Sequence, residues 1–412
     1  MSELRPRAEL RSATPGIARH GQLKRHRAWP LILQIIGVSL IVVLVSGASV
    51  GAVVVNSITS QIAPTIELTQ PTEGPIPRIG AIEGGFNILI VGSDTRQGQD
   101  GIGGSAEEET GQLNDVNMLL HVSQDQTNAV AISFPRDMVV GIPECVDEDG
   151  DTKGFSTEPI NVALYYGGLD CVAQTVSLLT GLPIQFAGII TFNGVIAMGD
   201  AIGGVPVCVT GAINDPNTGI TIDAAGTYEL KGVDALAFLR SREGVGDGSD
   251  LTRISSQQVY LSALVRKLQG EETLSDPKKV YDLATAALSN MQLSSSLGNL
   301  DTMVSIALAL KDVPPDRVTF VQYPGTTGGD GVYLGKVQPD FAAGDQLMAY
   351  VAADQPFNLS AVGDDRGSTV DPNAPVAEPD PNAEPVEPVD LPVLEGVTGQ
   401  KGSDYTCSVA NE

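Results

Sequence analysis

Three arginines lie close together between residues 238 and 258, in a chain whose formal net charge is -26. Arg240 and Arg242 alternate in the segment FLRSRE, so on an extended backbone their side chains would point the same way. Arg253 and Gln257 are four residues apart and would share one face of a helix. The planar guanidinium group offers several N–H donors to phosphate oxygens. This pattern favours an anion site, although a salt-bridged surface of an acidic protein would use the same residues.

Charged groups also follow two apolar runs at the expected ends of strands. FNILIV leads into Asp94 and Arg96, and AVAISF leads into Arg136 and Asp137, while Asp115 precedes a third apolar run. Open α/β folds bind ligands beyond the ends of their strands. Turn chemistry alone would explain any one of these segments. Taken with the arginines, they suit a pyrophosphate whose oxygens bind arginine, with Asp94 and Asp115 binding Mg²⁺ (or Mn²⁺).

Seven segments carry a resemblance to a known family. In chain order they are GSDTR, NDVNML, SFPRD, INVALYYGG, DAIGGV, LKGVDALAFLRSR and GDGSDLTRISSQQ. Each motif alone is weakly specific, but the ordered set resembles the LytR-CpsA-Psr (LCP) family, the cell-envelope phosphotransferases of Gram-positive bacteria. The resemblance covers about residues 85–270 and the apolar N-terminal segment. The acidic exported part and the paired cysteines resemble actinobacterial members.

The resemblance implies an enzyme and assigns roles to individual residues. Members transfer a glycopolymer with its phosphate from a polyprenyl-pyrophosphate carrier, whose tail lies in a long apolar pocket, to a peptidoglycan sugar hydroxyl. A non-catalytic polyprenyl-phosphate or polymer binder with a regulatory role, or a lipid pyrophosphatase, would use the same site. The implied catalytic residues are Asp94, Asp115, Arg136 and Arg240, and the implied substrate-binding residues are Arg96, Arg136, Asp137, Asn161, Arg240, Arg242, Asp250, Arg253 and Gln257.

Two positions depart from the family pattern. Pro159 precedes the Ile-Asn pair where the family usually has lysine, and Ser256 stands where it often has arginine. Both changes remove positive charge from the expected site.

The elements that must position these residues alternate between short apolar runs and helical patterns. Alternation of this kind predicts an α/β (α+β) layered fold, with a central mixed β-sheet flanked by helices. A serine or aspartate at 249–250 is expected to begin the helix that carries Arg253. The predicted strands are 86–91, 118–122, 129–134 and 188–192, and the predicted helices are 170–180, 193–202, 232–240 and about 250–268.

The segment from Leu31 to Val55 contains 25 residues without a charge and predicts a transmembrane helix. Seven basic residues precede it, which favours a cytoplasmic N-terminus and an extracellular remainder, single-pass in the cell membrane. A cleaved signal peptide is the alternative, but its apolar core would be unusually long. The exported part is even more acidic than the whole chain, which argues against nucleic acid as a partner.

Composition predicts five regions. We expect a basic cytoplasmic tail at 1–29, a signal anchor at 30–55, a stalk at 56–84, a folded domain at 85–355, and an acidic Pro-rich tail with a terminal cysteine segment at 356–412. The resemblance implies that the domain at 85–355 is catalytic. Within these, 97–112 is an insertion expected to form a mobile flap, and 366–396 has the composition of a disordered linker.

Four cysteines suit an oxidising exterior and allow three pairings. The favoured pairing joins Cys145 to Cys171, because these residues bracket one loop and the start of a helix, and leaves Cys208 for Cys407. Residues 147–158 come close to a calcium-binding loop, but Thr152 replaces the glycine that such loops need. An acidic surface loop is the favoured interpretation.

Overall fold

The computed structural model describes residues 29, 33–43, 45–46, 49, 65–69, 84–95, 112–147, 149–270, 277–298, 300–375 and 391–411. The chain divides into two compact units, Met1–Ser57 and Ile58–Glu412. In the first unit, Leu33–Val43 forms an apolar helix whose side chains are exposed, which is compatible with the expected membrane anchor. Among the described residues, one helical stretch has the length and apolarity to cross a membrane, Ile160–Thr180, but much of it is buried in the second unit.

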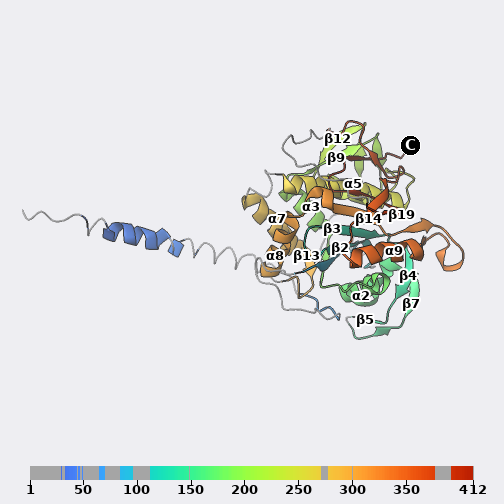
Figure 1. The fold of residues 1–412 in the computed structure, drawn as a ribbon, viewed down its shortest axis with the longest axis horizontal. Helices are drawn as coiled ribbons and strands as arrows, with labels where there is room; N and C mark the ends of the chain where they lie inside the picture. Colours follow the sequence, from blue (N-terminus) through green and yellow to red (C-terminus); the bar gives the residue numbers. More distant parts are fainter. Residues whose placement is uncertain are drawn as a thin grey trace, which may run out of the picture. The chain divides into compact units, whose positions relative to one another are not determined.

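An eight-stranded mixed sheet forms the centre of the second unit (Figure 1). Parallel pairs are β1 with β8, β3 with β14, and β17 with β19, and the remaining neighbours are antiparallel. The predicted central mixed sheet is therefore confirmed. The strands, in sheet order, are β13 (Met291–Leu293), β8 (Phe186–Ile190), β1 (Phe86–Ser93), β2 (Asn114–Val122), β3 (Ala129–Phe134), β14 (Val318–Gln322), β19 (Val393–Lys401) and β17 (Asn358–Val362).

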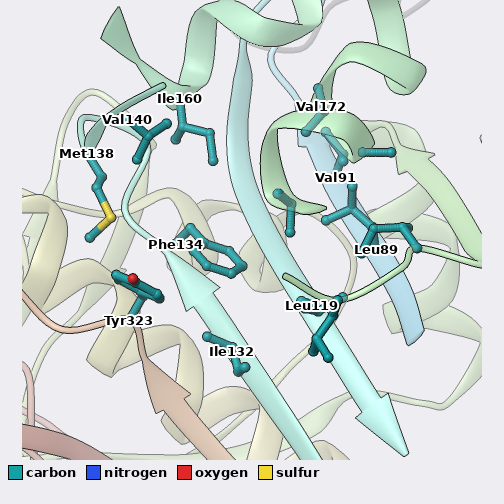
Figure 2. Packing of buried hydrophobic residues seen from close by; sticks show 14 of the residues in the cluster. Leu89, Val91, Leu119, Ile132, Phe134, Met138, Val140, Ile160, Val172 and Tyr323 are labelled. Atoms are coloured by element: carbon teal, nitrogen blue, oxygen red, sulfur yellow. The ribbon is translucent and has the colours of Figure 1, made fainter. Parts of the chain in front are cut away.

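Alternating side chains of the strands supply two apolar cores, one on each face of the sheet. Leu89 and Leu119 pack toward α2 (Ala163–Thr180) and α9 (Phe341–Ala352), as Figure 2 shows for part of this cluster. Ile88 and Met118 pack on the opposite face with residues of α5, α7 and α8. Because both faces are covered, the strands are apolar along most of their length, which is why they could be located in the sequence.

The predicted helices are present, and most have small shifts of their ends, but α2 begins seven residues before the predicted start at 170. They are α2, α3 (Phe192–Ala201), α4 (Gly232–Arg240) and α5 (Asp250–Gln269). Ser249 caps α5 by accepting a hydrogen bond from the N–H of Thr252, as predicted. The remaining helices are α7 (Pro277–Asn290), α8 (Leu300–Lys311), α9, and the 3-10 turns η1 (Ile160–Val162), η2 (Pro315–Arg317) and η3 (Gly331–Tyr333).

A smaller sheet lies beside α5. It contains four strands, β12 (Gly226–Leu230), β9 (Val205–Val209), β20 (Thr406–Ser408) and β18 (Ser368–Val370), in that order. Four two-stranded ribbons complete the described strands: β4 (Val139–Ile142) with β7 (Ser156–Pro159), β5 (Cys145–Val146) with β6 (Thr152–Lys153), β10 (Ile213–Asp215) with β11 (Ile220–Ile222), and β15 (Gly325–Thr327) with β16 (Val337–Pro339).

The folded unit extends well beyond residue 355, where the sequence analysis placed the start of an acidic tail. Strands β17 and β19 join the central sheet, and β18 and β20 join the smaller one. Two parts of the expected linker have a described structure, 366–375 around β18 and 391–396 at the start of β19, while 376–390 lies outside the described residues. Composition missed these strands because they flank the Pro-rich stretch, and three of the four have five residues or fewer.

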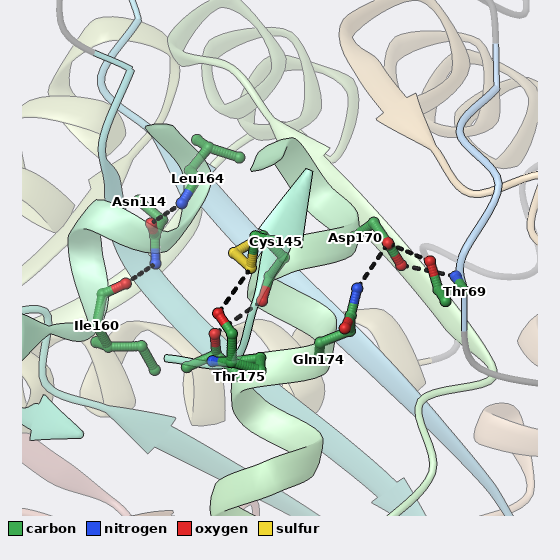
Figure 3. Close-up of a disulfide and its surroundings, with 10 residues drawn as sticks. Thr69, Asn114, Cys145, Ile160, Leu164, Asp170, Gln174 and Thr175 are labelled. Carbon is green, nitrogen blue, oxygen red and sulfur yellow. Dashed lines mark hydrogen bonds between the residues drawn. A yellow bond between two sulfur atoms is a disulfide. The ribbon is translucent and has the colours of Figure 1, made fainter. Parts of the chain in front are cut away.

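Both predicted disulfides are present. Cys145 is bonded to Cys171 between β5 and α2, where Figure 3 shows it, and Cys208 is bonded to Cys407. The second pair also forms facing residues of the parallel strands β9 and β20. This disulfide therefore ties the last described strand to a strand that lies 199 residues earlier.

Removing the long-range disulfide should cost more than removing the short-range one. The chain-entropy relation gives about 5 kcal/mol for a loop of the length that Cys208 and Cys407 close, and about 3.5 kcal/mol for the loop between Cys145 and Cys171. We expect this order for the two double Cys→Ser variants in urea unfolding followed by circular dichroism. Equal losses would show that the non-covalent contacts of β20 are sufficient to fix it.

Candidate functional site

A β-bulge positions Asp115. Strands β1 and β2 pair residue by residue except at Asp115, which has no partner on β1. A bulge bends its strand and redirects the side chain of the extra residue. The carboxylate Oδ1 of Asp115 accepts a hydrogen bond from Arg136 Nη1 at 2.5 Å, and its backbone oxygen accepts one from Arg253 Nη2 at 2.8 Å. The segment expected to be a loop is thus an irregular strand end.

The neighbouring asparagines have a structural role. Asn114 is fully buried and donates to the backbone oxygen of Ile160, while its Oδ1 accepts from the N–H of Leu164 (Figure 3). These bonds fix the start of α2 against β2. Asn161 follows directly, and its N–H donates to the backbone oxygen of Arg136 at 3.2 Å.

Asp250 connects three arginine-bearing segments. It is the first residue of α5, where the helix dipole favours a carboxylate, and it is 7% exposed. Its Oδ1 accepts from Arg242 Nη2 at 3.0 Å and pairs with Arg253 Nη2 at 2.6 Å. Its Oδ2 accepts from the backbone N–H of Arg136 at 2.9 Å. We call Arg136, Arg242 and Arg253, with Asp115 and Asp250, the arginine cluster.

The cluster has a buried base and a more accessible rim. The side chain of Arg253 is 6% exposed and forms the base of the cluster. The side chains of Arg136 and Arg242, which we call the rim arginines, are 25% and 28% exposed. Among the described residues, the Nε atoms of Arg136 and Arg253 have no hydrogen-bond acceptor although both atoms are buried. Buried donors normally have partners, so these two atoms are unsatisfied within the described part of the chain.

The electrostatics differ between the two rim arginines. Burial lowers the pKa of Arg136, but the carboxylates of Asp115, Asp250 and Asp137 outweigh this effect and raise the pKa above its ordinary value. Burial lowers the pKa of Arg242, and the like charges of Arg253 and Arg136 lower it further. Repulsion among the three guanidinium groups is therefore only partly compensated at Arg242, and an added anion would relieve it.

Asp137 connects Lys336 to Arg136 of the arginine cluster. Its Oδ1 lies 3.2 Å from Lys336 Nζ, and its Oδ2 lies 3.9 Å from Arg136 Nε. Lys336 comes from the turn that precedes β16, almost two hundred residues further along the chain. Sequence reasoning missed it because no local pattern connects it to the arginines.

Asp215 is a second residue that the sequence analysis missed. It is 1% exposed at the end of β10, and its Oδ2 accepts from Ser241 Oγ and from the backbone N–H groups of Arg242 and Glu243, all between 2.9 and 3.1 Å. Burial raises the pKa of this carboxyl, but the hydrogen bonds from Arg242, Ser241 and Asn217 outweigh it, and the net pKa is lowered. Asp215 thus fixes the backbone that carries Arg242.

Arg240 and Gln257 have different surroundings from those expected. Arg240 ends α4 and Ser241 is its C-cap, so Arg240 and Arg242 do not share an extended segment. The Arg240 guanidinium lies over the ring of Phe192, 4.3 Å from its centre. Gln257 is buried, and its Nε2 donates to the backbone oxygen of Leu239 at 2.7 Å, which fixes the end of α4.

Asp94 lies just beyond β1, next to the strand that carries Asp115. Its N–H donates to the backbone oxygen of Leu113, and its Oδ1 accepts from the N–H of Leu113 at 2.9 Å. The two carboxylates therefore belong to the same end of two adjacent strands. Arg96 and residues 97–111 of the expected flap lie outside the described residues.

The two departures from the family pattern can also be placed. Pro159 ends β7, and the nearby Lys153 lies over the ring of Tyr166, 4.5 Å from its centre. Ser256 is buried and shares a hydrogen bond of 2.8 Å with Ser408 Oγ on β20. An arginine at this position would have to displace β20.

The acidic segment 147–158 forms part of a hairpin. Asp147 Oδ1 accepts from the N–H groups of Asp149 and Asp151, which closes the turn between β5 and β6. Glu158 lies on another strand and accepts from the hydroxyl of Tyr166, whose pKa this bond raises to about 12. These acidic residues therefore have separate local roles.

Two cavities in the described part of the chain are both lined by residues outside the arginine cluster. One, of about 270 Å³, is lined by residues such as His121, Arg317 and Asp354. The other, of about 810 Å³, lies beside the disulfide of Cys208 and Cys407. The contacts and charges of its side chains define the arginine cluster.

The sequence of this chain is similar to the sequences of known proteins. A model of the LytR_cpsA_psr family matches residues 52–346. The cell wall biosynthesis protein LcpA of Corynebacterium glutamicum is 29% identical over 282 residues, which cover 61% of this chain and 52% of that protein. TagT of Bacillus subtilis, named a polyisoprenyl-teichoic acid–peptidoglycan teichoic acid transferase, is 26% identical over 257 residues, covering 61% of this chain and 72% of TagT.

Solved structures agree in fold. The LytR-Csp2A-Psr enzyme from Actinomyces oris has a TM-score of 0.52 at 21% identity, covering 70% of this chain and 96% of that chain. Bacillus subtilis TagV has a TM-score of 0.51 at 21% identity, covering 67% and 100%. The chain spans about half the length of LcpA and of the related LcpB of Corynebacterium glutamicum.

Removing the Asp250 carboxylate should destabilise the protein strongly. Asp250→Ala leaves the buried Arg253 without its carboxylate partner, and breaking a buried pair in this way costs about 3–5 kcal/mol. Asp234→Ala is the matched control, because it removes an exposed acid from the first turn of α4 and should cost at most about 1 kcal/mol. Urea unfolding measures both, and similar losses would contradict the central role of Asp250.

The contribution of Asp215 should depend on pH. Its pKa in the folded state lies below the ordinary value of 3.8, so its contribution is complete above pH 3.8 and is lost as the pH falls through the folded-state pKa. We expect Asp215→Asn to lower the free energy of unfolding by about 1–3 kcal/mol at neutral pH and by less as the pH falls well below 3.8. The exposed Asp223 provides the control, Asp223→Asn. A difference that does not shrink in acid would contradict this account.

Proposed function

The chain belongs to the LytR-CpsA-Psr family, and on this premise we propose that it is a phosphotransferase that joins a glycopolymer to peptidoglycan. The donor is a glycopolymer on a polyprenyl-pyrophosphate carrier, and the acceptor is a peptidoglycan sugar hydroxyl. The observation that carries the proposal is the convergence of Arg136, Arg242 and Arg253 on two carboxylates, with buried Nε atoms that have no acceptor among the described residues. Such a group of donors suits the oxygens of a pyrophosphate.

The chemistry that this site can support is electrostatic. The acceptor hydroxyl attacks the phosphorus that carries the glycopolymer, the bond from that phosphorus to the bridging oxygen breaks, and polyprenyl phosphate leaves. Such a transfer requires in-line positioning and stabilisation of charge more than a protein nucleophile. The rim arginines Arg136 and Arg242 bind the non-bridging oxygens, while Arg253 and Asp250 keep them oriented. The hydroxyl proton passes to a carboxylate, for which Asp94 and Asp115 are the candidates.

A divalent cation fits the two carboxylates by donor chemistry. Carboxylate oxygens are the protein ligands that Mg²⁺ prefers. Asp94 follows β1, and Asp115 is the unpaired residue at the start of the adjacent strand β2, at the same end of the sheet. Asp115 is paired with Arg136, so its carboxylate connects a proposed metal ligand to a proposed phosphate ligand. When bound, Mg²⁺ (or Mn²⁺) would neutralise pyrophosphate charge.

The polyprenyl tail requires an apolar surface. The face of the central sheet toward α7 and α8 has partly buried apolar side chains, including Ile90, Leu120, Met291 and Met303. Methionine side chains adapt to irregular apolar ligands. We assign the tail to this face, and the exposed apolar helix Leu33–Val43 to a membrane anchor, so that the site would act on a membrane-bound donor outside the cell.

Loss of one rim arginine should abolish most transfer. With the full chain in detergent, Mg²⁺, a polyprenyl-pyrophosphate-linked saccharide and peptidoglycan fragments, Arg136→Lys and Arg242→Lys should each lower the rate of product formation by about 10²-fold or more. Arg317→Lys is the control, because Arg317 is exposed and lines the 270 Å³ cavity away from the cluster. Mass spectrometry detects both products, polyprenyl phosphate and the joined saccharide.

The products separate the proposal from its alternatives. Release of polyprenyl phosphate that does not depend on an acceptor would identify a lipid pyrophosphatase. Lipid binding without any turnover would identify a non-catalytic binder. If wild type neither binds the donor nor transfers the saccharide, the proposed function is wrong.

A further inference from the structure

The segment that carries Arg242 lacks regular structure of its own. Residues 241–249 join α4 to α5, and we call them the arginine loop. Gly246 and Gly248 have φ values of 50° and 77°, which other residues adopt rarely. A glycine-rich loop of this kind has many alternative conformations, so contacts with the rest of the protein must select the one in which Arg242 reaches Asp250.

Two other parts of the chain contact the arginine loop. Asp215 binds residues 241–243, as described above. Residues 409–411 bind residues 243–246. Val409 accepts at its backbone oxygen from the N–H of Gly246 at 2.9 Å, and the N–H of Asn411 donates to the backbone oxygen of Gly244 at 3.1 Å. The side-chain Nδ2 of Asn411 donates to the backbone oxygen of Glu243 at 2.8 Å.

Residues 409–411 are themselves fixed through β20. Cys407 on this strand is bonded to Cys208 on β9, and Ser408 contacts Ser256 on α5. Ala410 donates its N–H to Thr210 Oγ1 at 3.1 Å, just beyond β9. Strand β20 has only three residues, so the disulfide supplies a covalent constraint where the ladder is short.

We propose that residues 409–411 are a positioning element for Arg242, and that the disulfide of Cys208 and Cys407 keeps this element in place. Three hydrogen bonds restrict the arginine loop to the conformation in which the Arg242 guanidinium meets Asp250. A ligand group that is oriented before binding loses less entropy when the ligand arrives. The link to pyrophosphate affinity rests on the proposed function, whereas the link to loop conformation does not.

Hydrogen exchange tests the effect on the loop. In a chain that ends at Ser408, the Gly246 amide loses its acceptor, and the amides of the arginine loop should exchange about tenfold faster or more. Amides in the middle of α5, such as that of Ala263, should exchange at the wild-type rate if the fold is intact. Unchanged exchange in the loop would overturn the proposal.

Two single substitutions test the same contact with less disturbance of the fold than the deletion. Asn411→Ala removes only the side-chain bond to Glu243, and we expect about a threefold increase in loop exchange. Asn373→Ala is the control, because Asn373 is also exposed and no described side-chain contact joins it to the loop. Equal effects of the two variants would also overturn the proposal.

A double-mutant cycle tests the effect on the site. Calorimetry with geranylgeranyl pyrophosphate and Mg²⁺ should show about tenfold weaker binding for the chain that ends at Ser408 and no further weakening when the deletion is added to Arg242→Ala. A general structural role would instead make the two losses add, which would overturn the proposal. If wild type does not bind this probe, the proposed function fails, and hydrogen exchange alone decides the role of residues 409–411.

Discussion

One buried carboxylate makes the arginine cluster possible. Three guanidinium groups repel one another, and burial alone would disfavour their charges. Asp250 offsets this cost by accepting from Arg242, Arg253 and the backbone of Arg136, which come from three separate segments. Its place at the start of α5 adds the favourable field of the helix terminus. The orientation of the rim therefore depends on where α5 begins, and Ser249 determines that point by capping the helix.

The sheet contributes the other half of the site through an irregularity. Regular pairing would keep Asp115 in the β1–β2 ladder, with its backbone groups directed at the neighbouring strand. The bulge frees its carbonyl for Arg253 and turns its carboxylate to Arg136. Asp115 then lies on the strand next to the one that Asp94 follows, and it contacts the arginines of other segments. A local defect in the ladder thus joins the proposed metal ligands to the proposed phosphate ligands.

The smaller sheet links the arginine cluster to the last described residues of the chain. Strand β20 lies between β9 and β18 in the sheet beside α5, and the residues after it contact the arginine loop. Asp215 contacts the same loop from β10. The loop between α4 and α5 is therefore supported from two directions, although its own sequence is rich in glycine. The geometry of the arginine cluster therefore depends on the stability of the smaller sheet.

The sequence by itself determined four strands and four helices before residue 270, the family resemblance and the favoured cysteine pairing. Apolar runs buried on both faces identified the strands, and the serine before Asp250 identified a helix start, because these signals are local. Arg136, Arg242, Arg253, Asp115 and Asp250 were all named from the sequence, yet their partners were not. The extended arrangement expected for Arg240 and Arg242 was wrong because the helix ends between them.

Only the tertiary structure decided which groups meet. Asp215 and Lys336 showed no pattern that sets them apart from other charged residues, and the strands after residue 355 were hidden by the composition of the stretch between them. Hydrogen bonds and ion pairs depend on distances of a few ångströms between residues that are tens to hundreds of positions apart. Those distances follow from how the sheets, the disulfide of Cys208 and Cys407, and α5 pack together, and no local spacing in the sequence encodes them.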